Sequence, residues 1–501
     1  MNLIRGFVSV LGSKIGVIFL GVIITPLLVR FLGSSLYGDY AFLLSVLSVT
    51  MILVNAGIFD GTRKFIAEDR GYSEWVEQVF GFYLRVAFVL ATLAAAIYAA
   101  FSWYGFTERV LGSGFEVYFY LLGLLVVARQ ANSVVRGGLM GLGLESKSEP
   151  LLVLRKFLFG ISTLALLYLG YDIVGVLVGH IFATLTVMTL GYVIFFRYVD
   201  IRSVFTPIHE GFPKRELLSF NSLSVVLILL TASLYHVDVL LLRLIAGDQA
   251  TGYYRAALVI AEFLWFVPNT LQTVLLHSSS ELWADEKTER ISTLTSRTTR
   301  YNLSLTLLLT IGIASLAVEF VPLYFGSEFQ PTVLPLLLLL PGAVGFALAR
   351  PIFAVGQGKG SLRPLIAATG AASILNLVLN LLLIPKYGMA GAAVATSIGY
   401  GVMIFFHIWA ARSVGFNPIS DLRLPRIAVT AVITAAIIFP TATAIGSSIG
   451  SLLIVPPLGF IVYSALSIKL GVVPPEEILP LVSQLPEPLE GYIRTGIKAI
   501  Q

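Results

Sequence analysis

Several long apolar segments of this sequence carry charged and amide side chains at helical spacings. Arg129 and Arg136 are seven residues apart with Asn132 between them, which places all three on one face of a helix. Arg255 and Glu262 show the same seven-residue spacing. Guanidinium groups on such a face bind anions through paired hydrogen bonds, and a carboxylate in an apolar segment can carry a proton. The residues that could do this chemistry are Lys14, Arg30, Arg129, Asp238, Arg255, Glu262 and Asn269.

The composition shows what surrounds these residues. The 501-residue chain is 57% hydrophobic and only 12% charged, with a mean hydropathy of +0.89. Soluble domains are about 25% charged, so the sequence predicts a membrane protein. The net charge of +5 is what loops beside anionic lipid supply, and it requires no nucleic-acid partner. The chain contains no cysteine, which excludes disulfides and cysteine metal sites.

Fourteen segments are apolar and long enough to cross a membrane, which takes about 20 residues. They should be helices, because a spanning segment must pair its own backbone polar groups. We therefore expect an all-α polytopic membrane protein with no large soluble domain. The expected spans are 6–32, 40–60, 78–102, 116–139, 150–170, 173–196, 216–245, 253–276, 296–322, 331–355, 362–384, 388–411, 425–445 and 449–470.

The orientation follows from the distribution of Lys and Arg. If the N-terminus lies inside, the cytoplasmic loops hold most of the basic residues, and the outer loops hold little more than Arg109 and Lys386. This bias predicts a multi-pass protein of the cell membrane with both termini in the cytoplasm. The segment 471–501 is interrupted by prolines and is expected to be a cytoplasmic or interfacial tail.

Two parts of the sequence resemble each other at a separation of about 214 residues. The matches follow one order along the chain and are nearly free of gaps, which predicts two parallel six-helix repeats followed by two extra helices. The expected domains are 1–213, 214–413, 414–470 and the tail. Because six is even, both repeats enter the membrane from the same side. The matching pairs are Gly33 and Gly247, Gly38 and Gly252, Tyr40 and Tyr254, Arg136 and Arg350, Pro150 and Pro364, and, at a separation of 216, Tyr171 and Tyr387.

The first of these matches predicts a pair of equivalent turns. Gly33 and Gly38 suit a tight outer turn, and Tyr40 suits an anchor at the membrane interface. The second copy, with Gly247 and Tyr254, should make the same turn. We expect the two turns to face each other across an outer gate.

The chain resembles the polysaccharide-transporter (Wzx-type) oligosaccharide flippases, which belong to the superfamily that includes lipid II flippases and multidrug and toxin extrusion (MATE) transporters. The resemblance rests on the 6+6+2 arrangement and on three phrases: FLGSSLYGDYAF, NAGIFDGTRKFIAE and the YGMAGAAVA of residues 387–395. It implies a MATE-like fold and the flipping of a polyprenyl- or dolichyl-linked oligosaccharide to the outer leaflet by alternating access. Glycosyltransferases or polymerases of the same pathway are the implied partners.

The resemblance also implies where the cargo binds. In this superfamily the first, second, seventh and eighth helices surround the central cavity, which favours Lys14, Arg30, Asp238, Arg255 and Glu262. Lys and Arg would compensate the phosphates of the lipid carrier. Asn269 extends the second stripe, and Arg129 is predicted because it lies near the middle of its span. Asp238 and Glu262 are the candidates for ion coupling.

A structural interpretation of several residues stays open. Arg30 and Arg255 lie near the outer ends of their spans, where arginine side chains can reach the interface. Arg136 and Arg350 occupy equivalent inner ends and are better explained as braces between helices. Pro268 interrupts a helix beside the cavity, which suits gating and ordinary tolerance of proline equally.

The remaining alternatives concern the class of protein. No phosphate-binding loop, acidic metal motif or histidine zinc motif is present, so we expect no enzyme, no catalytic residue, no metal site and no cofactor. A cation-coupled MATE-type exporter of small molecules is the alternative function. A membrane-embedded glycosyltransferase or polymerase is a third hypothesis, disfavoured because the chain has no long outer loop.

Overall fold

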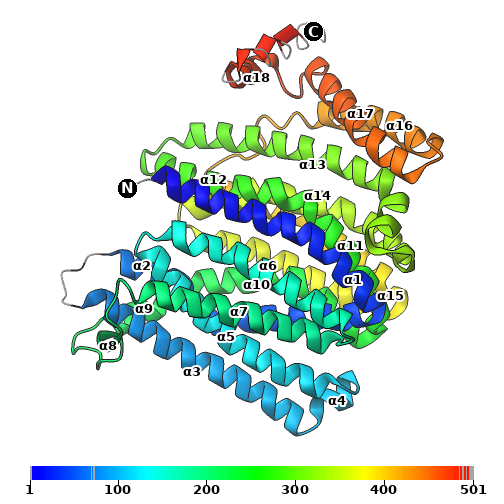
Figure 1. Cartoon of the computed structure of the whole chain (residues 1–501). Coiled ribbons are helices and arrows are strands. Elements are labelled where there is room, and N and C mark those ends of the chain that lie inside the picture. Colours follow the sequence, from blue (N-terminus) through cyan, green and yellow to red (C-terminus); the bar gives the residue numbers. More distant parts are fainter. Residues whose placement is uncertain are drawn as a thin grey trace. The chain divides into compact units, whose positions relative to one another are not determined.

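The computed structural model describes residues 3–68, 70, 74–220, 222–483, 486–487, 490–491 and 494–495. Nearly all of this part of the chain is helical (Figure 1). Contacts divide the chain into two units, residues 1–252 and 253–501, which are described separately. Much of the predicted tail beyond residue 483 lies outside the described residues.

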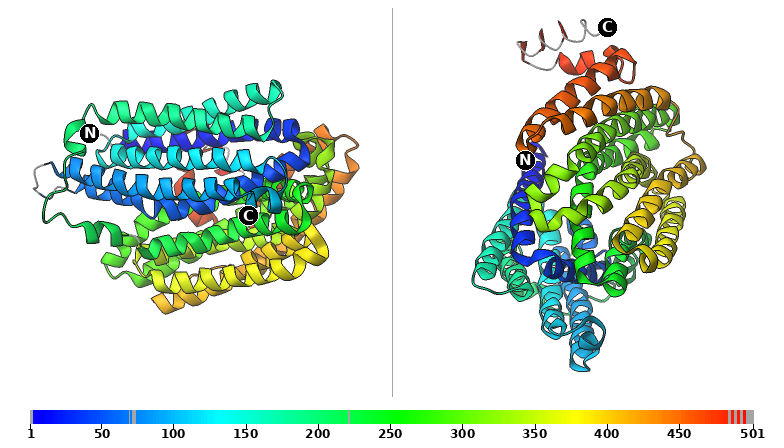
Figure 2. Two further views of the ribbon diagram at one scale, coloured as in Figure 1. Left: turned by 90° about the horizontal axis from the view of Figure 1, so that it is seen from below. Right: turned by 90° about the vertical axis from the view of Figure 1, so that its right-hand side faces the viewer.

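Unit 1 holds the first ten helices and the first turn of the eleventh. Its long helices run alongside one another, and the short α2, α4, α8 and α9 lie at their ends (Figures 1 and 2). The helices are α1 (Leu3–Asn55), α2 (Ile58–Ala67), α3 (Trp75–Trp103), α4 (Phe106–Leu111), α5 (Phe115–Gly141), α6 (Glu145–Tyr168), α7 (Ile173–Phe195), α8 (Ile201–Val204), α9 (Lys214–Ser219) and α10 (Ser222–Ala246).

Unit 2 holds the remainder of α11 and the helices that follow. A 3₁₀ turn, η1, separates α11 from α12, and a second one, η2, precedes α14. The elements are α11 (Asp248–Glu262), η1 (Phe263–Trp265), α12 (Phe266–Ala284), α13 (Thr288–Phe325), η2 (Ser327–Thr332), α14 (Val333–Gly358), α15 (Leu362–Val414), α16 (Leu424–Ala444), α17 (Ser448–Lys469) and α18 (Pro475–Val482).

Twelve helical segments of the described chain are long and apolar enough to cross a membrane. Two of them contain α1 and α15, which are each 53 residues long and change direction at one glycine. Gly33 has φ 68° and ψ 177°, and Gly388 has φ 55° and ψ −132°, values open to glycine and strained for other residues. If each of these helices crosses twice, the count reaches the predicted fourteen, a number that stays a prediction.

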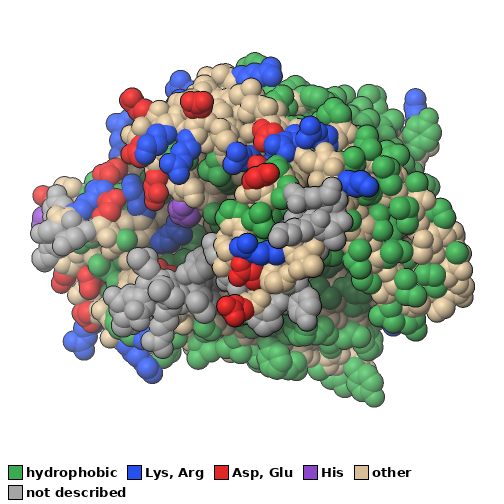
Figure 3. Space-filling view, turned by 90° about the horizontal axis from the view of Figure 1, so that it is seen from above, with side chains coloured by type: hydrophobic (Ala, Val, Ile, Leu, Met, Phe, Trp, Pro, Cys, Tyr) green, Lys and Arg blue, Asp and Glu red, His purple; other side chains and the backbone are tan. Residues whose placement is uncertain are grey.

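The exposed surface suits a lipid environment. Large hydrophobic side chains of α17 face outward, and Leu453 and Phe460 are 70% and 62% exposed. On the face shown in Figure 3, hydrophobic side chains cover a broad area, and most Lys, Arg, Asp and Glu side chains gather toward its left side. A surface of this kind is the one a helix bundle presents to lipid rather than to water. The chain is a multi-pass membrane protein.

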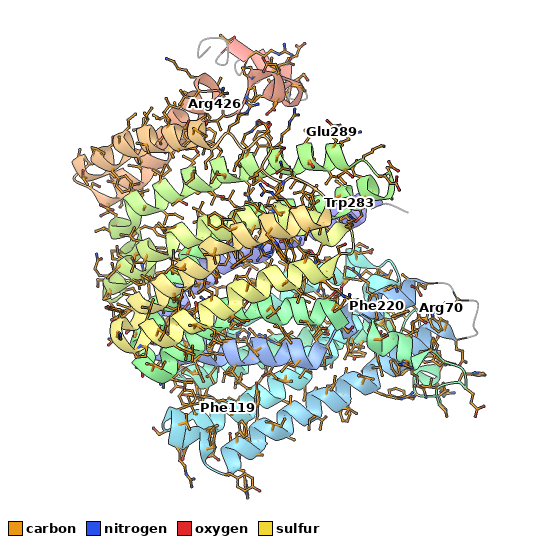
Figure 4. All side chains as sticks on the ribbon, turned by 180° about the vertical axis from the view of Figure 1, so that it is seen from behind. Arg70, Phe119, Phe220, Trp283, Glu289 and Arg426 are labelled. Atoms are coloured by element: carbon orange, nitrogen blue, oxygen red, sulfur yellow. The ribbon has the colours of Figure 1, made fainter. Side chains whose placement is uncertain are left out.

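One end of unit 1 is closed by an aromatic and ionic cluster. Arg70 and Phe220 lie at this end, and Phe119 lies toward the opposite one (Figure 4). The Arg70 guanidinium donates hydrogen bonds to Glu216 and Glu68 at 2.8 and 2.6 Å. These bonds raise the pKa of Arg70 above its ordinary value. The contacts connect α9 to the segment between α2 and α3.

An ionic network in unit 2 attaches α18 to α13. The Arg300 side chain is fully buried and forms ion pairs with Asp421 and Glu477, and Tyr301 also donates a hydrogen bond to Glu477. Burial raises the pKa of both carboxyl groups, but this effect is outweighed. Hydrogen bonds and the Arg300 charge lower the pKa of Asp421 and of Glu477 below the ordinary values. The network therefore needs both carboxylates in their ionised form.

Candidate functional site

The two equivalent glycine turns meet inside unit 1. A Cβ atom added to Gly38 would lie 1.9 Å from the backbone oxygen of Asp248, and one added to Gly252 would lie 1.9 Å from the backbone oxygen of Ser34. The two contacts are reciprocal, because Ser34 and Gly38 each differ by 214 from the residue that matches them. Ser35 Oγ donates a hydrogen bond to Asp248 Oδ2 at 2.7 Å in the same place. The predicted turns are thus in contact, and their role as an outer gate stays a prediction.

The two equivalent tyrosines are not interfacial anchors, so that expectation was wrong. Tyr40 is 6% exposed and Tyr254 is fully buried. The Tyr40 hydroxyl is 2.8 Å from Nε2 of His180 in unit 1, and in unit 2 the Tyr254 hydroxyl donates to Thr396 Oγ1 at 3.1 Å. Tyr40 and Tyr254 differ by 214 and His180 and Thr396 by 216, the two separations of the predicted duplication. The duplication therefore repeats a buried hydrogen bond as well as a turn.

The residues predicted to bind the cargo are distributed over both units. Lys14 and Arg30 lie on α1 and are exposed. Asp238 of α10 is fully buried, and its Oδ1 accepts a hydrogen bond from the backbone N–H of Val239 at 2.8 Å. These three residues, with Arg129, belong to unit 1. Arg255, Glu262 and Asn269 belong to unit 2.

Arg129 lies in a cationic cluster that the sequence analysis missed. Arg155 and Lys156 of α6 are close enough to Arg129 and to each other for their positive charges to repel. All three side chains are partly buried. The missed signal was available, because Arg155 and Lys156 are consecutive cations near the middle of an apolar span.

The stripe predicted in unit 2 brings two of its three members together. Arg255 Nη1 donates to Glu262 Oε1 at 2.7 Å, so the two charges are paired along α11. Asn269 lies beyond η1 and is exposed. The break at Phe263–Trp265 precedes Pro268, which has no N–H to donate to the backbone oxygen four residues before it.

The structural interpretation of two arginines gains support. Arg136 of α5 pairs with Glu149 of α6 at 2.8 Å, which braces two consecutive helices as predicted. Arg350, its equivalent in unit 2, lies 4.0 Å from the ring centre of Phe346 and 3.4 Å from Oε1 of Gln272 in α12. Among sequence-predicted charges, these two have clear structural partners.

An apolar groove opens between α13, α16 and α17 of unit 2. Its volume is about 420 Å³, and its lining is almost entirely aliphatic and aromatic, with Gly312 on α13 and Phe460 on α17. A second pocket of about 230 Å³ shares Leu308 and Phe460 with it and adds the hydroxyl groups of Ser304, Tyr463 and Ser467. Together they form one channel along α13 that is apolar along most of its length and polar at one end.

Comparison with known proteins identifies relatives of this architecture. The model of the polysaccharide biosynthesis protein family matches residues 3–276, which is more than half of the chain. A probable low-salt glycan biosynthesis flippase, Agl15 of Haloferax volcanii, is 23% identical over 482 residues and is covered over 96% of its length, against 93% of this chain. An uncharacterized membrane protein of Methanocaldococcus jannaschii is 28% identical, but the chain spans only about a third of that relative's length.

Two solved structures share the fold. The lipid II flippase MurJ in an inward closed conformation has a TM-score of 0.70 at 16% identity, covering 92% of this chain and 97% of MurJ. An inward-facing multidrug resistance MATE family transporter has a TM-score of 0.67 at 17% identity, covering 79% and 94%. These likenesses establish a MATE-like fold, and the match to the family model shows that the chain belongs to the polysaccharide biosynthesis protein family.

Proposed function

We propose that this protein is a flippase that moves a polyprenyl- or dolichyl-(di)phosphate-linked oligosaccharide from the cytoplasmic to the outer leaflet by alternating access. It is a transporter rather than an enzyme. The observation that carries the proposal is the similarity to the Haloferax glycan flippase over nearly the full length of both chains. The MATE-like fold supports it, because the solved lipid II flippase has the same fold.

The cargo poses two physical problems. Its glycan hydroxyls and phosphates cannot enter hydrocarbon about 30 Å thick without polar partners, and its lipid tail must stay in an apolar environment. We propose that Lys14, Arg30, Arg129, Arg255, Glu262 and Asn269 contact the polar part. In this proposal the protein lies in the cell membrane with both termini in the cytoplasm. Enzymes that build or polymerise the same glycan would be its pathway partners.

Transport is tested with purified protein in liposomes that contain a fluorescent lipid-linked oligosaccharide. We expect the wild-type protein to accelerate its movement between leaflets, measured by the fraction that a membrane-impermeant quencher reaches. Arg255→Ala should reduce the rate at least tenfold with the protein still folded, because it removes a cation and leaves Glu262 unpaired. Arg197→Ala, an exposed arginine at the end of α7, is the control and should transport normally. If no plausible lipid-linked glycan moves faster than in empty liposomes, the proposed function is wrong.

Export of small molecules remains the alternative function. The MATE-type fold favours it, and buried Asp238 could carry a coupling proton. The two functions separate in a deletion strain. Loss of surface glycan with unchanged drug sensitivity supports the flippase, and increased drug sensitivity with intact glycan supports the exporter.

We further propose that the apolar groove of unit 2 holds the polyprenyl chain of the cargo. Its lining has almost no polar surface, and Phe460 at the groove is 62% exposed, so an isoprenoid chain could enter from the lipid. The polar end, with Tyr463 and Ser467, suits the point where the chain meets its phosphate.

Filling this groove should block transport without unfolding the protein. A Cβ atom on Gly312 meets nothing within 4 Å, so Gly312→Phe projects a ring into open space. We expect at least a tenfold loss of flipping for the long-chain carrier and a smaller loss for a short-chain analogue. Gly446→Phe, at a glycine that also has open space around it but lies outside the groove, is the matched control. Equal transport by the two variants would remove the groove from the mechanism.

A further inference from the structure

A pocket inside unit 1 is lined by hydrogen-bond donors that lack acceptors. It lies between α5, α6 and α7, and its polar lining consists of Asn132, Arg136, Ser148 and Arg155. Ser148 is 1% exposed and its Oγ has no partner among the described residues; the same holds for Nε of Arg136. Buried donors of this kind are normally satisfied, so the pocket is suited to an acceptor that comes from outside the chain.

The charge around this pocket has the same sign. Arg155 lines it, and Arg129 and Lys156 lie beside Arg155. Within the described part of the chain, Arg129 and Arg155 form no ion pair, and the recorded partner of Lys156 is the ring of Phe159, 5.3 Å from its Nζ. Glu149 is the carboxylate near the pocket, and it is already paired with Arg136. Unneutralised cations at membrane depth are costly and mark functional sites.

The second repeat shows that the fold does not need these cations. At the separation of 214, Arg129 corresponds to Ala343, Arg155 to Thr369 and Lys156 to Gly370. Arg136 alone has a cationic equivalent, Arg350, and that residue packs over the ring of Phe346 at 4.0 Å.

Aromatic rings take the place of the pocket in unit 2. Phe346 corresponds to Asn132, and it packs against Trp265 and Tyr400 at 4.4 and 4.9 Å between ring centres. Leu362 corresponds to Ser148. The same helices therefore assemble in unit 2 around an apolar core, and the donors and charges of unit 1 serve something other than folding.

We propose that Asn132, Arg136, Ser148 and Arg155, with Arg129 and Lys156 beside them, form a binding site for a phosphate or diphosphate group within unit 1. Arginine suits this ligand, because its guanidinium donates paired hydrogen bonds to phosphate oxygens. The phosphate has two sources, the lipid carrier and inorganic phosphate in solution. The assignment to the carrier rests on the proposed flippase function, whereas the anion site itself does not.

The test measures thermal unfolding of the full-length protein in detergent, with inorganic diphosphate in one series and geranylgeranyl diphosphate in another. We expect at least one of them to raise the unfolding temperature in a saturable manner. Arg155→Gln should increase the half-saturating concentration at least tenfold. Arg197→Gln, which removes the same charge from an exposed position of the same unit, should change it less than twofold. A response to the prenyl compound alone identifies the lipid as the source, and a response to both identifies a site open to the free anion.

A second measurement separates binding from structural support. Without ligand, Arg155→Gln should unfold at the same temperature as the wild type or a higher one, because it removes an uncompensated cation. Two results would overturn the site: a wild-type protein that neither compound stabilises, or equal effects of Arg155→Gln and Arg197→Gln. Neither depends on transport, so a protein that binds diphosphate without flipping would refute the flippase and leave the site in place.

Discussion

Gly38→Ala is expected to destabilise the protein and to abolish transport. The new methyl group would lie 1.9 Å from the backbone oxygen of Asp248 and 2.8 Å from the backbone nitrogen of Gly252. These are backbone atoms that cannot rotate away, so α1 and α11 must separate. Overpacking of this kind costs about 1–3 kcal/mol. Thermal unfolding in detergent and the liposome assay would measure the two effects.

The control is Gly12→Ala in the same helix, where the added methyl group meets nothing within 4 Å. It should stabilise the protein by about 1 kcal/mol, since alanine is the better helix former. Gly252→Ala should resemble Gly38→Ala, and the double variant should lose less than the sum because both glycines belong to one crossing. Wild-type stability and transport in Gly38→Ala would show that the close contact of the two turns is dispensable.

The second large effect is expected at the ionic network of unit 2. Removing both carboxylates with Asp421→Ala and Glu477→Ala leaves the fully buried Arg300 without its ion pairs. An unpaired buried charge costs about 3–5 kcal/mol, so the unfolding temperature should fall strongly. Adding Arg300→Met should restore most of the loss, because the buried charge is then gone. A triple variant as unstable as the double would contradict this explanation.

The network should also respond to acid. The pKa values of Asp421 and Glu477 are lowered in the folded protein, so their stabilisation is complete above the unfolded-state values of about 3.9 and 4.3. It is lost as the pH falls below them. Proteolysis of α18 during acidification would follow this loss, and in the Arg300→Met triple variant it should not depend on pH in that range.

Much of the fold could be predicted because its signals are local. Apolar length determines the spans, and glycine at positions 33 and 247 determines where the chain turns. The duplication was also detectable, since Tyr40 and Tyr254 repeat at a separation of 214. Their burial was not, because an exposed anchor and a buried hydrogen-bonding tyrosine have the same local sequence.

The candidate sites were less predictable, since they depend on helices far apart in the chain. Arg243 of α10 is paired with Asp39 of α1, a contact between residues 204 positions apart that no periodicity reveals. Arg155 and Lys156 were overlooked because neighbouring residues point to different sides of a helix and form no stripe. Their meeting with Arg129 comes from the packing of α6 beside α5. Sequence spacing did find Arg255 and Glu262, which lie on one helix.

The single-residue corners at Gly33 and Gly247 have a mechanical consequence. No flexible linker separates the arms that each corner joins, so torque applied to one arm passes directly to the other. The halves of α1 must move as one rigid elbow, and α10 and α11 as another. A transport cycle in this protein would therefore be driven by the rocking of elbows, in the manner of linked levers, and not by spans that shift one at a time.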